Sequence, residues 1–300
     1  MTRYNSSRLL TPPREEEEIY PYRRVWHSLS IEMGGVFTIA LVFYVLVGFI
    51  GINLPQSLWR AANATLALSP AMFWLVFSWW RERRVPEPRE HLTAVFIISG
   101  LAANAVGIPL ITYLDVDQWL SSADTIGRIL GYAFTVGITQ ETIKYLVVRY
   151  LAWERGFRIR QDPLAYCLTS AMSYATVANL HFALDGVPSP DIVAMRIFSI
   201  TALHVTASTI VAFGMTELYF NPRTVFVQPL MLLLAAIVVG FGIPFRAGLT
   251  NSGFVLGIGG TRPILGFIFS LVLMVSVLVS FAFLFTTTER QAQEAAEEEA

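Results

Sequence analysis

The chain has 300 residues, of which 54% are hydrophobic and only 14% are charged, and its mean hydropathy is +0.55. Soluble domains carry roughly 25% charged residues, so this composition indicates an integral membrane protein in a lipid bilayer. The formal net charge of -1 gives no basis for a nucleic-acid partner. A lone cysteine, Cys167, excludes an intrachain disulfide and a cysteine-based metal site.

The two ends of the chain differ in composition from the middle. Residues 1–25 are charged and contain proline, and they lack the apolar run of a signal peptide, so we expect a disordered cytoplasmic tail there. The acidic end, 289–300, is predicted to form a second disordered cytoplasmic tail. Between them, residues 26–288 are predicted to form a single membrane domain, because no repeat or linker divides them.

A membrane-spanning helix needs about 20 mostly apolar residues, and the sequence predicts an all-α polytopic bundle of about eight such helices. Arginines gather in every second loop, which by the positive-inside rule places both termini in the cytoplasm. The predicted spans are 29–52, 62–80, 92–114, 126–152, 163–184, 192–219, 229–248 and 264–286.

The fourth span contains Gln140, Glu141 and Lys144, and Lys144 is the only lysine in the chain. Ionisable side chains inside a membrane are costly and usually face a bundle interior or a cavity, so they indicate function. Glu141 and Lys144 are three residues apart and therefore share a helix face. Two interpretations follow. The pair is either an ion pair that serves packing only, or a carboxylate that handles water while lysine keeps it ionised.

The fifth span adds Tyr174, Asn179 and His181 to the polar residues inside the membrane. Tyr174 lies on a face of small residues that favours close helix approach. Asn179 fits two roles, a hydrogen bond between helices or a place in a catalytic site. His181 fits a packing role or a direct role.

The sixth span contains Arg196, His204 and Ser208. His204 and Ser208 are one turn apart and share a face. The Ser208 hydroxyl also fits a hydrogen bond to its own helix backbone. For His204 we favour a functional role, because the polar residues of the fourth and fifth spans lie at a similar depth.

The polar residues of the three spans belong to three short sequence motifs within about 126–219. In chain order, these motifs are Gln140-Glu141-Thr142-Ile143-Lys144, Tyr174-Ala175-Thr176-Val177-Ala178-Asn179 and His204-Val205-Thr206-Ala207-Ser208. Together they resemble the Glu-Glu-x-x-Lys, Phe-Ala-x-x-Glu-Asn and His-x-x-x-Ser/Thr motifs of the PrsW family of intramembrane proteases, distant relatives of the CAAX prenyl proteases. Two glutamates of the family pattern are replaced, one by Gln140 and one by Ala178. Glutamine cannot accept a proton at neutral pH, and alanine offers no base or ligand.

The resemblance implies a catalytic set in which Glu141 polarises water, Lys144 tunes Glu141, and His204 and Asn179 stabilise the oxyanion. The remaining polar residues of the three helices would support this set, namely Gln140, Tyr174, Ser208 and Arg196. Family members are called metalloproteases, and zinc catalysis needs about three protein ligands. Here Glu141, His204 and His181 would be the three zinc ligands.

Three functions remain open on the sequence. The first is a glutamate-dependent protease, with or without a metal, that cleaves a single-pass membrane protein in the cell membrane of a prokaryote. The second is a catalytically degenerate relative that binds membrane segments without cutting them, which the two replaced glutamates favour. The third is a proton-coupled transporter, since Glu141, Lys144, Arg196 and His204 would also suit a solute path.

Overall fold

The computed structural model describes residues 24–52, 54–85, 88–154, 156–221, 225–251 and 262–298, so most of the predicted tail 1–25 lies outside the described residues. The described residues form helices and loops without strands. The helices are α2 (Arg24–Phe43), η3 (Tyr44–Phe49), α3 (Gln56–Trp74), η4 (Leu75–Trp79), α4 (Trp80–Glu82), α5 (Leu92–Ala102), η5 (Ala103–Gly107), α6 (Ile108–Leu114), α7 (Val116–Trp119), α8 (Thr125–Tyr132), η6 (Ala133–Gly137), α9 (Ile138–Ala152), α10 (Asp162–Leu184), α11 (Pro190–Phe220), α12 (Val227–Asn251) and α13 (Pro263–Glu298).

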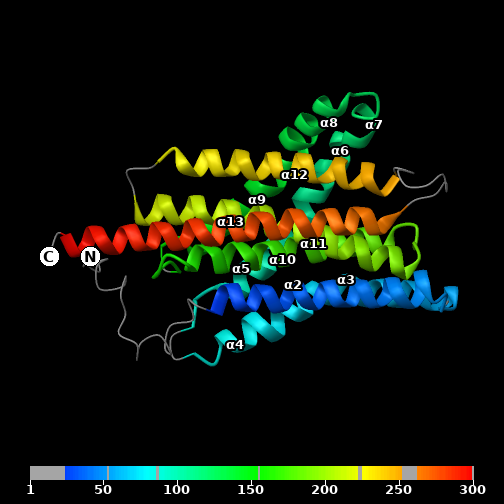
Figure 1. Ribbon diagram of the computed structural model, residues 1–300, viewed down its shortest axis with the longest axis horizontal. Helices are drawn as coiled ribbons and strands as arrows, with labels where there is room; N and C mark the ends of the chain where they lie inside the picture. Colours follow the sequence, from blue (N-terminus) through cyan, green and yellow to red (C-terminus); the bar gives the residue numbers. More distant parts are fainter. Residues whose placement is uncertain are drawn as a thin grey trace.

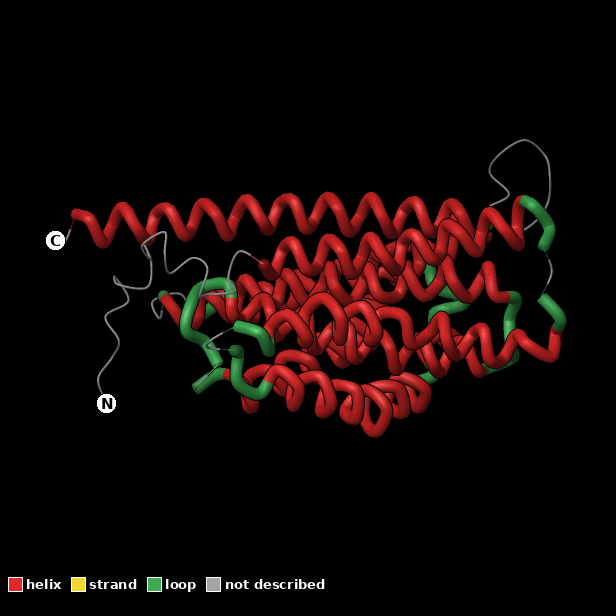
Figure 2. Tube along the Cα trace, turned by 90° about the horizontal axis from the view of Figure 1, so that it is seen from below, coloured by secondary structure: helices red, strands yellow, loops and turns green. Residues whose placement is uncertain are grey.

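The long helices form one elongated bundle, with most loops at its two ends (Figure 2). Helices α10 and α11 pack along each other at its centre. Helices α3 and α5 cover α10, while α2, α12 and α13 cover α11. Helices α6, α7 and α8 lie at one side of the bundle, beyond α12 (Figure 1). The two central helices are therefore surrounded by protein on most sides.

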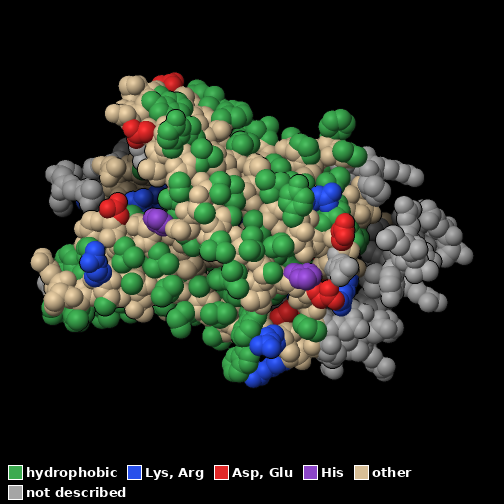
Figure 3. Space-filling model, turned by 180° about the vertical axis from the view of Figure 1, so that it is seen from behind, with side chains coloured by type: hydrophobic (Ala, Val, Ile, Leu, Met, Phe, Trp, Pro, Cys, Tyr) green, Lys and Arg blue, Asp and Glu red, His purple; other side chains and the backbone are tan. Residues whose placement is uncertain are grey.

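Six helical stretches are long and apolar enough to cross a membrane, so the chain is a multi-pass integral membrane protein. They are Val25–Phe49, Gln56–Glu82, Leu92–Leu114, Pro190–Phe220, Val227–Asn251 and Pro263–Gln291. The space-filling view agrees, because hydrophobic side chains cover the middle of the molecule and charged ones gather toward its ends (Figure 3).

We predicted eight membrane spans, two more than the six helical stretches that are long and apolar enough. The other two predicted spans, 126–152 and 163–184, are helical at 125–152 and in α10, but neither is among the six. Both carry the polar residues of interest, and most α10 side chains are buried against protein rather than exposed to lipid. The protein interior thus accepts polar side chains that a lipid-facing helix would exclude.

The two ends of the described chain lie at the same end of the bundle, where α2 begins and α13 ends (Figure 1). The cytoplasmic location of this end stays a prediction. Helix α13 continues to Glu298, whereas we expected disorder from residue 289. The segment from 289 onward is rich in Glu, Gln and Ala, which have high helix propensity, so the membrane helix extends into it.

Two π-helical segments adjoin the polar helices. Segment η6 leads directly into α9, and η5 packs against α10. Such segments are frequent at functional sites, since the wider turn redirects the side chains that follow. At the end of η6, a Cβ on Gly137 would lie 2.6 Å from the Ala236 carbonyl oxygen. Only glycine therefore permits this approach of η6 to α12.

Candidate active site

Glu141 and Lys144 form an ion pair inside the bundle, as their spacing on α9 predicts. Lys144 Nζ lies 2.7 Å from Glu141 Oε1, and the two side chains are 3% and 0% exposed. Besides Lys144, Ser208 is a hydrogen-bonding neighbour of the Glu141 carboxylate, but neither carboxylate oxygen accepts a hydrogen bond of good geometry from the described residues. Buried carboxylate oxygens normally accept hydrogen bonds. Glu141 is therefore charge-balanced but retains free acceptor capacity.

Helix α11 supplies the other partners of Lys144. Lys144 Nζ donates a hydrogen bond to Ser208 Oγ at 2.8 Å and lies 3.4 Å from His204 Nδ1. An ammonium only donates, so Nδ1 is the acceptor nitrogen of His204, and the proton of the neutral imidazole is on Nε2. Lys144 thus links α9 to α11 through one carboxylate, one hydroxyl and one imidazole.

Tyr174 on α10 packs against His204 and Lys144. Its ring lies 5.1 Å from the His204 ring and 5.9 Å from Lys144 Nζ. The buried Tyr174 hydroxyl has no hydrogen-bond partner among the described residues. It points at Gly107 of η5, where a Cβ would collide with the hydroxyl. The glycine leaves room for a phenol that is free to donate a hydrogen bond. We call Glu141, Lys144, Tyr174, His204 and Ser208 the α9–α11 cluster.

Asn179 lies in the same pair of helices but makes a different contact. Its Nδ2 donates to Thr201 Oγ1 on α11 at 3.2 Å, and its buried Oδ1 has no hydrogen-bond partner within the described part of the chain. Thr201 precedes His204 by one helical turn. Asn179 therefore joins α10 to α11 next to the cluster.

The other candidate residues do not join the cluster. His181 is exposed, and its Nε2 lies 2.9 Å from Asn104 Oδ1. Arg196 is exposed as well, and its guanidinium packs 3.9 Å from the centre of the Phe182 ring. Gln140 is half-buried. Within the described ranges, no three His, Cys, Asp or Glu side chains gather in a metal-binding group. The expected zinc set of Glu141, His204 and His181 is thus not assembled.

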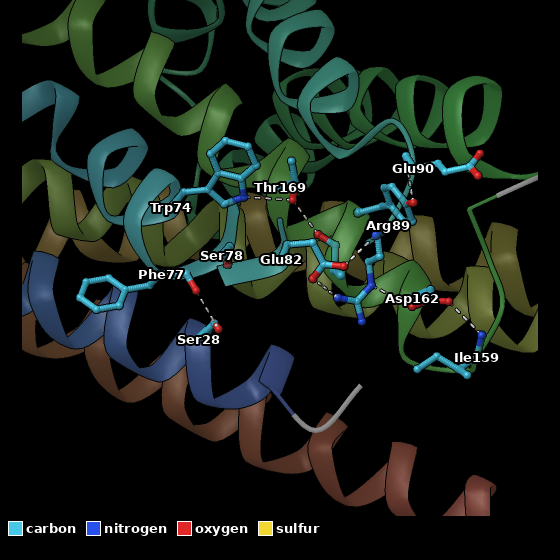
Figure 4. Close-up of polar contacts among 12 residues, drawn as sticks. Ser28, Trp74, Phe77, Ser78, Glu82, Arg89, Glu90, Ile159, Asp162 and Thr169 are labelled. Atoms are coloured by element: carbon cyan, nitrogen blue, oxygen red, sulfur yellow. Dashed lines mark hydrogen bonds and ion pairs between the residues drawn. The ribbon is translucent and has the colours of Figure 1, made fainter. Parts of the chain in front are cut away.

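A second group of buried charges lies where α4, α5 and α10 meet, and none of its members is among the predicted site residues. Arg89 donates to Asp162 Oδ1 and to Glu82 Oε2, each at 2.8 Å (Figure 4). Burial opposes the charge of Arg89, but attraction to Asp162 and Glu82 outweighs burial and raises the pKa of Arg89 above its ordinary value. Nearby, Arg160 pairs with Glu217. In the sequence, Arg89 looked like one more loop arginine.

The comparisons with known proteins bear on this geometry. Residues 87–287 match the PrsW family, described as PrsW family intramembrane metalloprotease. This segment covers more than half of the chain, contains the whole α9–α11 cluster, and confirms the resemblance seen in the motifs. Comparison with curated proteins gives no match, and comparison with solved structures gives none either. The chain belongs to the PrsW family of intramembrane metalloproteases.

Proposed function

We propose that the chain hydrolyses a peptide bond of a membrane-embedded substrate, with Glu141 as the residue that activates water. One observation carries the proposal, which is the buried α9–α11 cluster in the segment that matches the family. Acyl transfer to water requires a base that activates the water and hydrogen-bond donors for the oxyanion. The carboxylate, imidazole and phenol of the cluster can supply these groups. The proposed substrate has a single membrane span and lies in the cell membrane of a prokaryote.

The proposed steps use the side chains of the cluster. Glu141 accepts a proton from water while the water oxygen forms a bond to the scissile carbonyl carbon. The carbonyl oxygen becomes an oxyanion, and the Nε2 hydrogen of His204 and the Tyr174 hydroxyl are available to donate to it. Glu141 then returns the proton to the leaving amine as the C–N bond breaks. Lys144 favours the ionised form of Glu141 between these steps.

Three further residues have positioning roles in this proposal. Ser208 holds the ammonium of Lys144 in place through their 2.8 Å hydrogen bond. Asn179 fixes the register of α10 against α11 through Thr201. Gln140 follows η6 and precedes Glu141, at the point where the π-helical segment sets the direction of α9.

The residues around Glu141 do not fit a catalytic metal with three protein ligands. Catalytic zinc takes three such ligands and an open position, and the described part of the chain offers no group of three. Lys144 Nζ lies 2.7 Å from Glu141 and 3.4 Å from His204 Nδ1, where its charge would repel a metal cation. The proposed chemistry therefore uses the side chains of this chain alone.

A second candidate function is a relative that binds membrane segments without cutting them. Two observations favour it. Glu141 has no exposed surface, so a substrate reaches it only after the helices move. The site also holds one carboxylate, because Gln140 and Ala178 stand where the family motif has glutamates.

A cleavage assay separates the two functions. Purified protein in proteoliposomes is incubated with a fluorescent single-span reporter, alongside Glu141→Gln and the exposed control Glu154→Gln. Cleavage by the wild type, with a loss of about 10²-fold to 10⁴-fold in Glu141→Gln only, supports the protease. Intact reporter with the wild type, and cleavage after Gln140→Glu and Ala178→Glu together, supports the binding protein and overturns our proposal.

A further inference from the structure

A cavity of about 40 Å³ lies at the junction between the family segment and the helices that precede it. Residues of α2, α3 and α4 form one side, and Arg89, α5 and α10 form the other (Figure 4). Residues 24–82 lie before the matched range 87–287. The cavity is therefore a feature that the family match does not explain, and it lies apart from the α9–α11 cluster.

Glu32 contributes a buried carboxylate to this cavity. It is 2% exposed and belongs to the apolar stretch Val25–Phe49. Ser78 Oγ donates a hydrogen bond to Glu32 Oε1 at 2.5 Å, and no lysine or arginine among the described residues forms an ion pair with Glu32. A membrane helix carries such a side chain at a considerable cost, which indicates a ligand or a function.

Two groups at the cavity have incomplete pairing among the described residues. Glu82 and Asp162 share the guanidinium of Arg89, and the Glu32 carboxyl group forms a hydrogen bond with Ser78 but no ion pair. The Arg89 Nη2 atom is buried and has no hydrogen-bond partner in the part of the chain that the structure describes. Arg81, which is exposed, also lines the cavity. A ligand that satisfies these groups carries a cationic donor together with an anionic acceptor.

We propose that this cavity binds the headgroup of an aminophospholipid. The primary ammonium meets Glu32, and the phosphate meets Arg89 and Arg81. A primary ammonium has three N–H donors for a carboxylate, whereas a trimethylammonium has none. A cavity needs a volume of roughly 10–15 Å³ to hold one water molecule. The volume of about 40 Å³ therefore accommodates an ammonium group with its short linker. The arginines and tryptophans at this end of the bundle place the cavity near the headgroups.

Native mass spectrometry in nanodiscs tests the proposal on the full chain. Nanodiscs contain phosphatidylethanolamine, its N-methylated forms or phosphatidylcholine, and the protein is wild type, Glu32→Gln or Glu154→Gln. Glu154 is an exposed carboxylate that does not line the cavity. We expect retention of phosphatidylethanolamine to fall with each added methyl group. We expect Glu32→Gln to bind it about tenfold more weakly or worse, because the amide oxygen still accepts a hydrogen bond but no longer carries the charge that strengthens it, and Glu154→Gln to behave like wild type.

Other results overturn the proposal. Equal retention of all headgroups, or unchanged retention by Glu32→Gln, means that Glu32 is a neutral packing residue. In nanodiscs that contain phosphatidylglycerol in place of these lipids, retention stronger than that of phosphatidylethanolamine means that the arginines bind phosphate alone. Soluble O-phosphoethanolamine, added to protein in detergent, separates a free ligand from a lipid, and saturation by this compound at micromolar concentration contradicts a lipid site. A thermal melt of Glu32→Gln in phosphatidylcholine shows that the variant is folded.

Discussion

Replacing Lys144 by methionine removes the counter-ion of Glu141 and leaves a similar volume. The carboxylate stays in the bundle with no exposed surface, and its ion-pair partner 2.7 Å away is gone. Breaking a buried ion pair on one side costs about 3–5 kcal/mol, since the remaining charge has neither water nor a partner. We expect the free energy of unfolding to fall by about this amount, with a further small loss from the Ser208 hydrogen bond.

Unfolding in mixed micelles, followed by circular dichroism, measures this loss. The double variant Glu141→Leu with Lys144→Met removes both charges, and it should recover most of the lost stability because no buried charge remains. The control is Arg149→Met, since Arg149 lies on the same helix, is half-buried, and forms no ion pair with a carboxylate among the described residues. A Lys144→Met variant within about 0.5 kcal/mol of wild type would refute the buried ion pair, as this is the size of ordinary surface effects.

Three more variants test the site and its surroundings. Tyr174→Phe should lower the cleavage rate about tenfold or more and leave stability unchanged, since its hydroxyl forms no hydrogen bond with the residues that the structure describes. Tyr166→Phe should leave the cleavage rate unchanged and lower the free energy of unfolding by about 1 kcal/mol in thermal melts. The reason is that the Tyr166 hydroxyl donates to the Glu90 carbonyl at 2.5 Å. Arg89→Leu should destabilise the protein by about 3–5 kcal/mol in the same melts, since it strands Asp162 and Glu82. Unchanged stability of Arg89→Leu would contradict a tightly packed junction.

The helix positions could be predicted from the sequence with good accuracy. The predicted range 163–184 compares with α10 at Asp162–Leu184, and 192–219 compares with α11 at Pro190–Phe220. Apolar length and the prolines at the helix starts determine these limits. The π-helical segments could not be predicted, because they depend on how neighbouring helices meet. Gly137 against Ala236 is one such contact.

Part of the candidate site was also predictable. Spacing along one helix placed Glu141 beside Lys144 and His204 beside Ser208, and the structure joins these pairs through Lys144. Spacing gave no information on how the faces of different helices meet. The pairing of His181 with Asn104 therefore depends on the tertiary packing.

The ion pairs of Arg89 could not be predicted from the sequence either. Arg89 and Asp162 are far apart in sequence and lie outside the predicted spans, where arginines and aspartates are usually solvated. Only the packing of the α4–α5 loop against the start of α10 buries them. Their one signal in the sequence is that an aspartate, Asp162, immediately precedes the fifth predicted span.

Hydrolysis in ¹⁸O-labelled water tests the central claim most directly. Water supplies one oxygen atom of the new carboxyl group when a peptide bond is hydrolysed. Mass spectrometry of the reporter fragments should therefore find one ¹⁸O at the new C-terminus with wild type and Glu154→Gln. Glu141→Gln, folded by its thermal melt, should give neither fragments nor label. Labelled fragments from Glu141→Gln at the wild-type rate would contradict the role of Glu141 in activating water.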